Sequence, residues 1–256
     1  MVTHDLGIDT EAAYIIPLSC LHIGEGFDEK KFNGYRDWIL ARDNAYCLIL
    51  GDVTGNSIMG SKGDTHGSMR PDEQKDEAER VLRPLAEEGK ILGWVDGNHE
   101  RRTSRLVDQF IGKDICKILG IRDVYDPDGI YMFLSVGYDR AKGTRNRNVY
   151  TGFMIHGYTG ARRQGGKANA MEDMAKGVHA DFYVCAHAHQ KMMFPSESLM
   201  PETRSKKLKF KKRTHVMAGS FQGWAGYAVR SNFQPTPMGS PRIRLDGLRH
   251  DIHTSI

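Results

Sequence analysis

Seven short apolar runs recur along the chain, and they are continuous rather than strictly alternating. They are YIIPL (14–18), YCLIL (46–50), ILGWV (91–95), IYMFLSV (130–136), YTGFMI (150–155), FYVCA (182–186) and THVMAG (214–219). A strand that is covered on both faces gives such a run, because neither set of its side chains meets water. The pattern therefore predicts sheets that are buried between other layers.

Segments with helical periodicity separate these runs. Apolar residues recur at helical spacing in four of them: Phe32 to Ile39, Ala78 to Leu85, Leu106 to Ile118 and Met171 to Val178. Pro71 and Gly89 mark the start and the end of the second helix, and Gly112 is expected to break the third. The alternation predicts a mostly parallel sheet with covering helices, and the short strands after residue 190 predict an added antiparallel sheet.

The composition is that of a globular protein. The 256 residues are 39% hydrophobic and 27% charged, which excludes a disordered or fibrous chain. We expect a single domain over residues 1–256, with a motif-bearing core at 14–190 and residues 191–256 completing the second sheet. No apolar run approaches the ~20 residues of a membrane span, and the N-terminus lacks a signal pattern, so we expect a cytoplasmic protein without membrane contact.

The cysteines predict neither disulfides nor a zinc ribbon. There are four of them, and none forms a C-x-x-C pair. Cys47, Cys116 and Cys185 lie in apolar or helical patterns and are expected to be small buried residues. Cys20 differs because it follows the first apolar run, next to polar residues.

Metal-competent side chains follow five of the predicted strands. They are Cys20 and His22; Asp52; Asn98, His99 and Glu100; His156; and His187 and His189. Taken singly, each has an ordinary explanation as a turn, helix-cap or packing residue. Five occurrences in order make independent explanations improbable, because function in α/β sheets gathers beyond the carboxyl ends of the strands. The sequence therefore predicts one site.

These residues form five motifs: C-L-H (20–22), G-D-V-T-G (51–55), G-N-H-E (97–100), H-G (156–157) and A-H-A-H (186–189). In the same order they resemble the D-x-H, G-D-x-x-D, G-N-H-E/D, His-Gly and G-H-x-H motifs of the calcineurin-like metallophosphoesterases. The resemblance implies an α/β fold, a four-layer α/β/β/α sandwich of two mixed sheets flanked by helices. It also implies a binuclear metal centre.

The resemblance implies a role for each motif residue. The first metal would be bound by Cys20, His22, Asp52 and His189, and the second by Asp52, Asn98, His156 and His187. His99 would be the general acid that protonates the leaving oxygen, after attack by a hydroxide that bridges the metals.

The donor types limit the metals. Two neighbouring cations repel each other unless an anionic ligand such as Asp52 lies between them. Imidazole, amide and carboxylate donors suit Mn, Fe, Zn or Co rather than Ca or Mg. We expect two divalent transition metal ions, with Mn first and with Zn or Fe favoured if Cys20 is a ligand.

The sequence departs from the family motifs at three positions. Cys20 replaces an aspartate, and it either binds metal as a thiolate or points away and leaves the first site incomplete. Gly55 replaces an aspartate that orients the general acid, so Asn56 or another group must orient His99. Ala186 replaces a glycine, which we expect to be tolerated.

Basic residues near the motifs are candidates for binding substrate phosphate. Arg101 and Arg102 follow the G-N-H-E turn, and Arg162, Arg163 and Lys167 lie in the loop GYTGARRQGGK after His156. Arginine binds phosphate oxygens bidentately, and glycines let backbone amides approach an anion. The alternative for the first two is pairing with Asp96 or Glu100.

The net charge of +4 is concentrated in RSKKLKFKKR, residues 204–213. Leu208 and Phe210 would lie on one face of a strand and Lys207, Lys209 and Lys211 on the other. The lysines either protect an edge strand from aggregation or contact a nucleic-acid backbone, and we favour the second interpretation.

The sequence thus favours a metal-dependent phosphoesterase that hydrolyses phosphodiesters, on DNA or RNA as a nuclease. G-D-V-T-G-N lacks the Arg-Gly of the family's protein phosphatases, which disfavours a phosphoprotein substrate. The alternatives are a phosphomonoesterase, a small-molecule or cyclic-nucleotide phosphodiesterase, and a catalytically weakened nucleic-acid-binding protein of the same fold.

Overall fold

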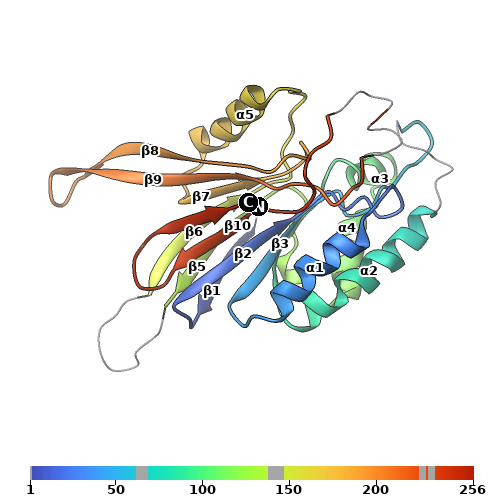
Figure 1. Ribbon diagram of the computed structural model, residues 1–256, viewed down its shortest axis with the longest axis horizontal. Helices are drawn as coiled ribbons and strands as arrows, with labels where there is room; N and C mark the ends of the chain where they lie inside the picture. The colour runs from blue at the N-terminus through green and yellow to red at the C-terminus, as the bar shows by residue number, and fades with distance from the viewer. Residues whose placement is uncertain (1, 62–68, 138–146, 225–228, 230–233) are drawn as a thin grey trace.

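The computed structural model describes residues 2–61, 69–137, 147–224, 229 and 234–256. Its strands form one five-stranded and one six-stranded mixed sheet, which pack face to face (Figure 1). Helices cover the outer face of each sheet. The predicted four-layer α/β/β/α sandwich is therefore confirmed.

The five-stranded sheet has the order β11-β10-β2-β3-β4. Its strands are β2 (Ala12–Leu18), β3 (Ala45–Leu50), β4 (Ile91–Val95), β10 (Arg242–Asp246) and β11 (Ile252–Ser255). The first three are parallel, as predicted, and β10 joins β2 in antiparallel orientation. β10 and β11 thus extend this sheet, whereas residues 191–256 were expected to complete the second one.

The six-stranded sheet has the order β1-β5-β6-β7-β9-β8. Its strands are β1 (Val2–Ile8), β5 (Ile130–Val136), β6 (Asn148–Met154), β7 (Phe182–Cys185), β8 (Met192–Glu202) and β9 (Lys207–Met217). β7 lies parallel to β6 on one side and to β9 on the other. The carboxyl ends of these three strands therefore point to the same edge of the sheet.

Three hydrophobic layers hold the sandwich together. α1 (Glu29–Leu40), α2 (Pro71–Glu87) and α4 (Ile111–Ile118) pack on the five-stranded sheet, and α5 (Gln164–Gly177) packs on the six-stranded one. Ile15 and Leu50 meet Leu134 and Val184 between the sheets. No helix in the described ranges has the length and apolarity that a bilayer-spanning helix needs.

The third predicted helix is divided at a different place from the one expected. α3 (Arg101–Val107) ends at Asp108, whose φ of 57° is left-handed, and α4 begins at Ile111. Gly112 lies inside α4, where a Cβ would overlap the Asp96 carboxylate and approach the Trp94 indole. The glycine therefore permits close packing and does not break the helix.

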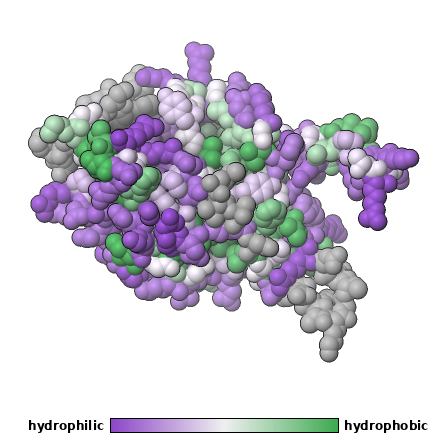
Figure 2. Space-filling view, turned by 180° about the vertical axis from the view of Figure 1, so that it is seen from behind, coloured by the Kyte–Doolittle hydropathy of each residue, from purple (hydrophilic) through white to green (hydrophobic). Residues whose placement is uncertain are grey.

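The β8–β9 hairpin projects from the body of the molecule (Figure 1, Figure 2). Leu199 faces Phe210 across the hairpin, and Met200 faces Lys209. The predicted alternation of apolar and basic residues is therefore confirmed. Lys207 and Met217 lie at opposite ends of β9, about 30 Å apart at roughly 3.3 Å per residue.

Candidate metal centre

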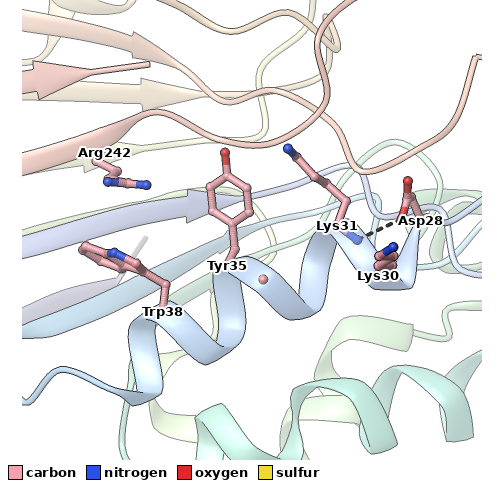
Figure 3. Close-up of a pocket in the computed structure, with 7 residues that line it drawn as sticks. Asp28, Lys30, Lys31, Tyr35, Trp38 and Arg242 are labelled. Carbon is pink, nitrogen blue, oxygen red and sulfur yellow. Dashed lines mark hydrogen bonds between the residues drawn. The ribbon is translucent and has the colours of Figure 1, made fainter.

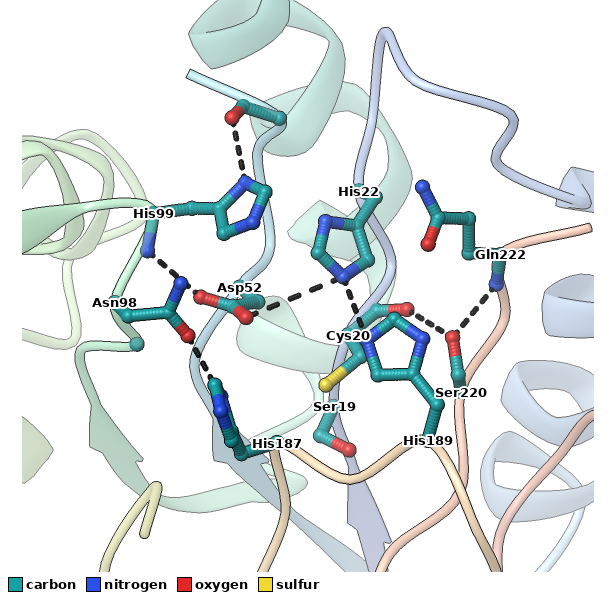
Figure 4. A network of polar contacts seen from close by, with 12 residues as sticks. Ser19, Cys20, His22, Asp52, Asn98, His99, His187, His189, Ser220 and Gln222 are labelled. Carbon is teal, nitrogen blue, oxygen red and sulfur yellow. Dashed lines mark hydrogen bonds and ion pairs between the residues drawn. The ribbon is translucent and has the colours of Figure 1, made fainter. Parts of the chain in front are cut away.

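Seven side chains predicted to bind metal lie together at the edge of the sheets where β2, β3, β4, β6 and β7 end. Figure 4 labels all of them except His156. One group consists of Cys20, His22, Asp52 and His189, and a second of Asp52, His156 and His187. Within each group the ligand atoms lie within 4.8 Å of one another. Asp52 belongs to both groups, so its carboxylate lies where two neighbouring cations would share it.

Asn98 completes the second group. Its Oδ1 lies 2.8 Å from Nδ1 of His187 and 3.2 Å from Nε2 of His156. An amide oxygen and two ring nitrogens therefore converge beside the shared carboxylate, as the motif order predicts.

Two loops that run side by side place the first group. The amide of Cys20 donates to the carbonyl of Gly51 at 3.0 Å, and the amide of His22 donates to that of Asp52 at 3.0 Å. The chain after β2 thus continues beside the chain after β3. This pairing brings the thiol, the imidazole and the carboxylate to one point.

The backbone of the centre is strained. Among the described residues, eight other than glycine have positive φ, and six of them belong to the centre: Cys20, His22, Asp52, Asn56, His187 and His189. Their φ values lie between 42° and 69°, a region of backbone conformation that residues other than glycine rarely adopt. Such strain persists only where the surrounding structure enforces it, and it clusters at functional sites.

Glu100 holds the loop that carries Asp52. Its carboxylate accepts hydrogen bonds from four backbone amides, those of Asp52, Val53, Thr54 and Gly97, at 2.8 to 3.1 Å. Glu100 is fully buried. The last residue of G-N-H-E is therefore an organiser of the centre and does not face the metal position.

Asp52 is held as an anion. Its Oδ2 lies 3.3 Å from Nε2 of His156 and 4.0 Å from Nε2 of His22. Burial alone would raise the pKa of this carboxyl, but the neighbouring imidazoles, led by His156, hold it well below its usual range. A buried carboxylate that is ionised suits a ligand shared by two cations.

The histidines present nitrogens to the same space. Nδ1 of His156 lies 2.5 Å from the carbonyl oxygen of Leu50, which fixes the ring and leaves Nε2 facing Asp52. Nε2 of His22 lies 3.0 Å from Nε2 of His189. Burial lowers the pKa of both rings, that of His189 to about 4, so both are neutral. Two neutral imidazoles with facing nitrogens fit a cation ligated by both.

Cys20 faces the centre. Its sulfur lies within 4.8 Å of the ligand atoms of His22, Asp52 and His189. Of the two readings of Cys20, this placement supports the thiolate ligand. Burial, and then the charge of Asp52, raise the pKa of the thiol well above its ordinary value, so a bound cation is needed to hold the thiolate.

A backbone carbonyl orients His99. Nδ1 of its ring lies 2.6 Å from the carbonyl oxygen of Gly55, and Nε2 lies 3.1 Å from Nη2 of Arg102. The Asn56 side chain donates to the carbonyl of His99 at 2.7 Å, so it holds the backbone and not the ring. His99 is therefore held at Nδ1 even though residue 55 has no carboxylate to bind the ring.

The predicted phosphate-binding residues differ in their placement. Arg102 lies at the centre and donates to the carbonyl of Gly55 at 2.9 Å. Arg101 pairs with Asp128 at 3.2 Å and not with the two acids considered from sequence. Arg162 and Arg163 are exposed just before α5, which takes in the second half of the predicted loop.

The structure corrects the assignment of Lys167. This residue is buried in the first turn of α5, and its ammonium donates to Oε1 of Gln190 at 2.9 Å and to the carbonyl of Ala188 at 3.4 Å. It therefore anchors the segment that carries His187 and His189, and it does not face an open phosphate site.

Sequence reasoning missed several supporting residues. The Ser220 hydroxyl donates to the carbonyl of Cys20 at 2.9 Å, from a segment 200 residues away. Tyr158 is 85% exposed and stacks on the ring of His187, with ring centroids 5.7 Å apart. Tyr158 could have been found from the sequence, because it lies two residues after His156. Nothing in the sequence around Ser220 indicates its role.

One surface cavity is lined by basic side chains together with Asp28. It has a volume of about 450 Å³ and lies along α1, where Lys31 and Arg242 point into the same space (Figure 3). The amide of Asp28 at its rim donates to the carbonyl of Phe221, whose own amide donates to the carbonyl of Cys20. One segment therefore joins the cavity to the candidate metal centre.

No protein-family model and no curated protein matches the chain. The chain is similar to the solved structure of vacuolar protein sorting 29 from Cryptosporidium parvum, with a TM-score of 0.47 and 15% identity over 96% of this chain and 98% of that one. It is also similar to a metallophosphoesterase from Sphaerobacter thermophilus, with a TM-score of 0.42 and 12% identity over 94% and 87% of the two chains. A calcineurin-like phosphoesterase from Bacillus subtilis gives 0.42 and 12% over 91% and 84%.

Similarity at this level carries no conclusion about activity. The two flanked sheets and the five motif loops at one edge nevertheless agree with the resemblance read from the sequence. The fold is the four-layer α/β/β/α sandwich that this resemblance implies.

Proposed function

We propose that the protein is a metal-dependent phosphoesterase that hydrolyses phosphodiester bonds. The observation that supports this most is the membership of Asp52 in both ligand groups. When bound, a pair of divalent cations would neutralise charge on the phosphoryl oxygens and activate a water molecule for attack. A shared carboxylate offsets the repulsion between the two cations.

The chain's own residues would supply the other parts of the reaction. Nδ1 of His99 is fixed on Gly55, so Nε2 is the atom that would pass a proton to the leaving oxygen. The guanidinium of Arg102 lies 3.1 Å from this nitrogen and donates to it in the neutral ring, so Nε2 would carry a proton for transfer once Arg102 turns to a phosphoryl oxygen and the ring is protonated. A phosphoryl oxygen bound by Arg102 would therefore hold the leaving group beside the proton donor.

The donors of the first group favour particular metals. A thiolate from Cys20 with two imidazoles and a carboxylate prefers Zn or Fe to the harder Mn. The second group, with an amide and a carboxylate oxygen, suits Mn better. We therefore propose Zn or Fe at the first position and Mn, Zn or Fe at the second.

We propose a nucleic acid, DNA or RNA, as the source of the phosphodiester. Two cationic surfaces could bind its backbone, the cavity beside α1 and the β8–β9 hairpin. The lysines of the hairpin lie toward its tip, away from the centre, and Lys209 and Lys211 pair with Glu202 and Asp181. We favour the cavity, because its rim residue Asp28 is joined through Phe221 to Cys20.

A chromogenic diester tests the proposed activity. The chain is freed of metal, reloaded with Mn, Zn or Fe, and assayed on bis(p-nitrophenyl) phosphate and on the corresponding monoester. We expect metal-dependent turnover of the diester that falls by more than ~100-fold in Asp52→Asn. Preference for the monoester would indicate a phosphomonoesterase. Absence of turnover, with tight and salt-sensitive DNA binding, would indicate the binding protein instead.

Charge reversal separates the two cationic surfaces. Lys31→Glu with Arg242→Glu should weaken cleavage of single-stranded DNA or RNA and leave the small diester unchanged. Lys207→Glu with Lys209→Glu is the matched pair on the hairpin and should have the smaller effect. The reverse order would assign the polymer to the hairpin, and equal turnover of the polymer by all variants would favour a small-molecule substrate.

A further inference from the structure

A carboxylate that the sequence did not indicate lies beside His99. Glu25 is in the loop between β2 and α1, and one of its carboxylate oxygens lies within 4.8 Å of ring nitrogens of both His22 and His99. It is partly buried. Glu25 therefore belongs to the surroundings of the proposed general acid, although no motif contains it.

Glu25 occupies the space in front of Gly55. A Cβ on residue 55 would lie 2.5 Å from Cγ and 2.7 Å from Cδ of Glu25, which is closer than such atoms pack. The φ of Gly55 is not in the left-handed region, so the backbone itself does not require glycine there. A side chain at residue 55 would instead have to displace the Glu25 side chain from its present place.

Three hydrogen bonds hold Glu25 in this place. Its carboxylate accepts a hydrogen bond from the hydroxyl of Ser57, on the loop whose Gly55 carbonyl orients His99. Its amide donates to the carbonyl of His22 at 2.7 Å, and its own carbonyl accepts from the side chain of Gln222 at 2.7 Å. Glu25 therefore braces the 55–57 loop against the loop that carries His22.

We infer that Glu25 is a positioning residue for His99, with its carboxyl group standing where a side chain on residue 55 would otherwise extend. It acts on His99 through the 55–57 loop and through the proximity of its charge. The inference rests on the proposed function, because His99 needs positioning only if it delivers a proton.

Two diesters with different leaving groups test the role of Glu25. Hydrolysis of a dinucleotide releases an alkoxide, which needs a proton. Hydrolysis of bis(p-nitrophenyl) phosphate releases p-nitrophenolate, which does not. We expect Glu25→Ala to lower turnover of the dinucleotide by roughly 10-fold or more and to change that of bis(p-nitrophenyl) phosphate much less. Metal content should stay as in the wild type. Glu88→Ala, which removes an exposed glutamate from the end of α2, is the matched control.

A swap of the two positions tests the geometry without relying on activity. Gly55→Asp alone should lower the thermal midpoint, because the new side chain overlaps Glu25. Glu25→Ala with Gly55→Asp should recover the midpoint, since the aspartate then extends into the vacated space. The double variant should also regain dinucleotide turnover relative to Glu25→Ala. Glu25→Gln keeps an acceptor for Ser57 and removes the charge, which separates bracing from electrostatics.

These experiments distinguish a failure of the proposed phosphoesterase function from a failure of the role inferred for Glu25. A wild-type chain that hydrolyses neither diester with any of the metals refutes the proposed function and this inference with it. An active wild type refutes the inference alone if Glu25→Ala slows both diesters equally, if it lowers the metal content, or if the double variant is no better than either single one.

Discussion

The carboxylate of Asp52 accepts a hydrogen bond from the backbone amide of His99, with Oδ1 2.9 Å from the nitrogen. The proposed shared ligand and the proposed proton donor are therefore joined directly. Glu100 binds the amide of Asp52 with one carboxylate oxygen and those of Val53 and Thr54 with the other. The ends of β3 and β4 thus form one unit, so the proposed metal binding and the proposed proton transfer would depend on each other.

Glu100→Gln should lower the free energy of unfolding by about 2–4 kcal/mol. A carboxamide has one acceptor oxygen, and its NH2 group would face backbone amides that also donate. Urea denaturation of the metal-free chain measures the effect, with the exposed Glu88→Gln as control. A change no larger than that of the control would contradict the role assigned to Glu100.

Cys20→Asp should shift the metal preference from Zn or Fe toward Mn and make activity resistant to peroxide. A carboxylate is a harder ligand than a thiolate, and it cannot be oxidised to a sulfenic acid. Elemental analysis after competition between Zn and Mn, together with inactivation by peroxide, provides the measurement. Cys47→Ser, at a buried cysteine of β3, should change neither property. Unchanged metal preference in Cys20→Asp would mean that the sulfur is not a ligand.

Asp96→Asn should remove part of the pH dependence of stability. Burial, and then the charge of Glu100, raise the pKa of Asp96 to about 7, whereas in the unfolded chain it titrates near its ordinary value of 3.8. At a pH between these two values, Asp96 therefore keeps its proton in the folded state and has lost it in the unfolded state. This stabilising contribution is fully present below the unfolded value and is lost as the pH rises toward about 7.

The variant and the wild type should thus diverge with pH. Relative to Asp96→Asn, the wild type should lose roughly 2–4 kcal/mol between about pH 4 and about pH 8. Denaturation curves at several pH values give the difference. A difference that does not change with pH would show that Asp96 is ionised in the folded protein throughout.

Lys167→Met should weaken metal binding and leave the KM for the small diester unchanged. The ammonium holds Gln190 and the carbonyl of Ala188, so its loss loosens the segment of His187 and His189. Metal titration and steady-state kinetics separate these effects, and Arg163→Ala at the exposed start of α5 is the comparison. An increase in KM without loss of metal would restore the phosphate-binding interpretation of Lys167.

The parts of the fold that sequence predicted are those with a local cause. β4 has the bounds of the run ILGWV, because a strand buried on both faces excludes polar residues. β5 has the bounds of IYMFLSV, although its burial alternates and Phe133 is exposed on one face. β1 was not predicted, since VTHDLGI has no such run and is held by parallel pairing with β5, more than a hundred residues away. The break between α3 and α4 was misplaced because Gly112 serves a tertiary contact.

The same division holds for the centre. The order of motifs at strand ends located its side chains, since parallel strands bring their carboxyl ends to one edge. Sequence could not show the direction of Cys20 or the carbonyl of Gly55, because a side-chain rotamer and a backbone acceptor leave no residue signal. Sequence could not show that Lys167 is buried against Gln190, because position near the motifs does not distinguish an exposed cation from a buried anchor.

The central claim is that two cations share the carboxylate of Asp52, and electron paramagnetic resonance of the manganese-loaded chain tests it most directly. At two equivalents of Mn, the wild type should give the spectrum of an exchange-coupled pair, and Asp52→Asn should give only isolated ions or bind less than the full complement. A wild type that binds two Mn ions without coupling between them, or a coupled pair that persists in Asp52→Asn, would contradict the account.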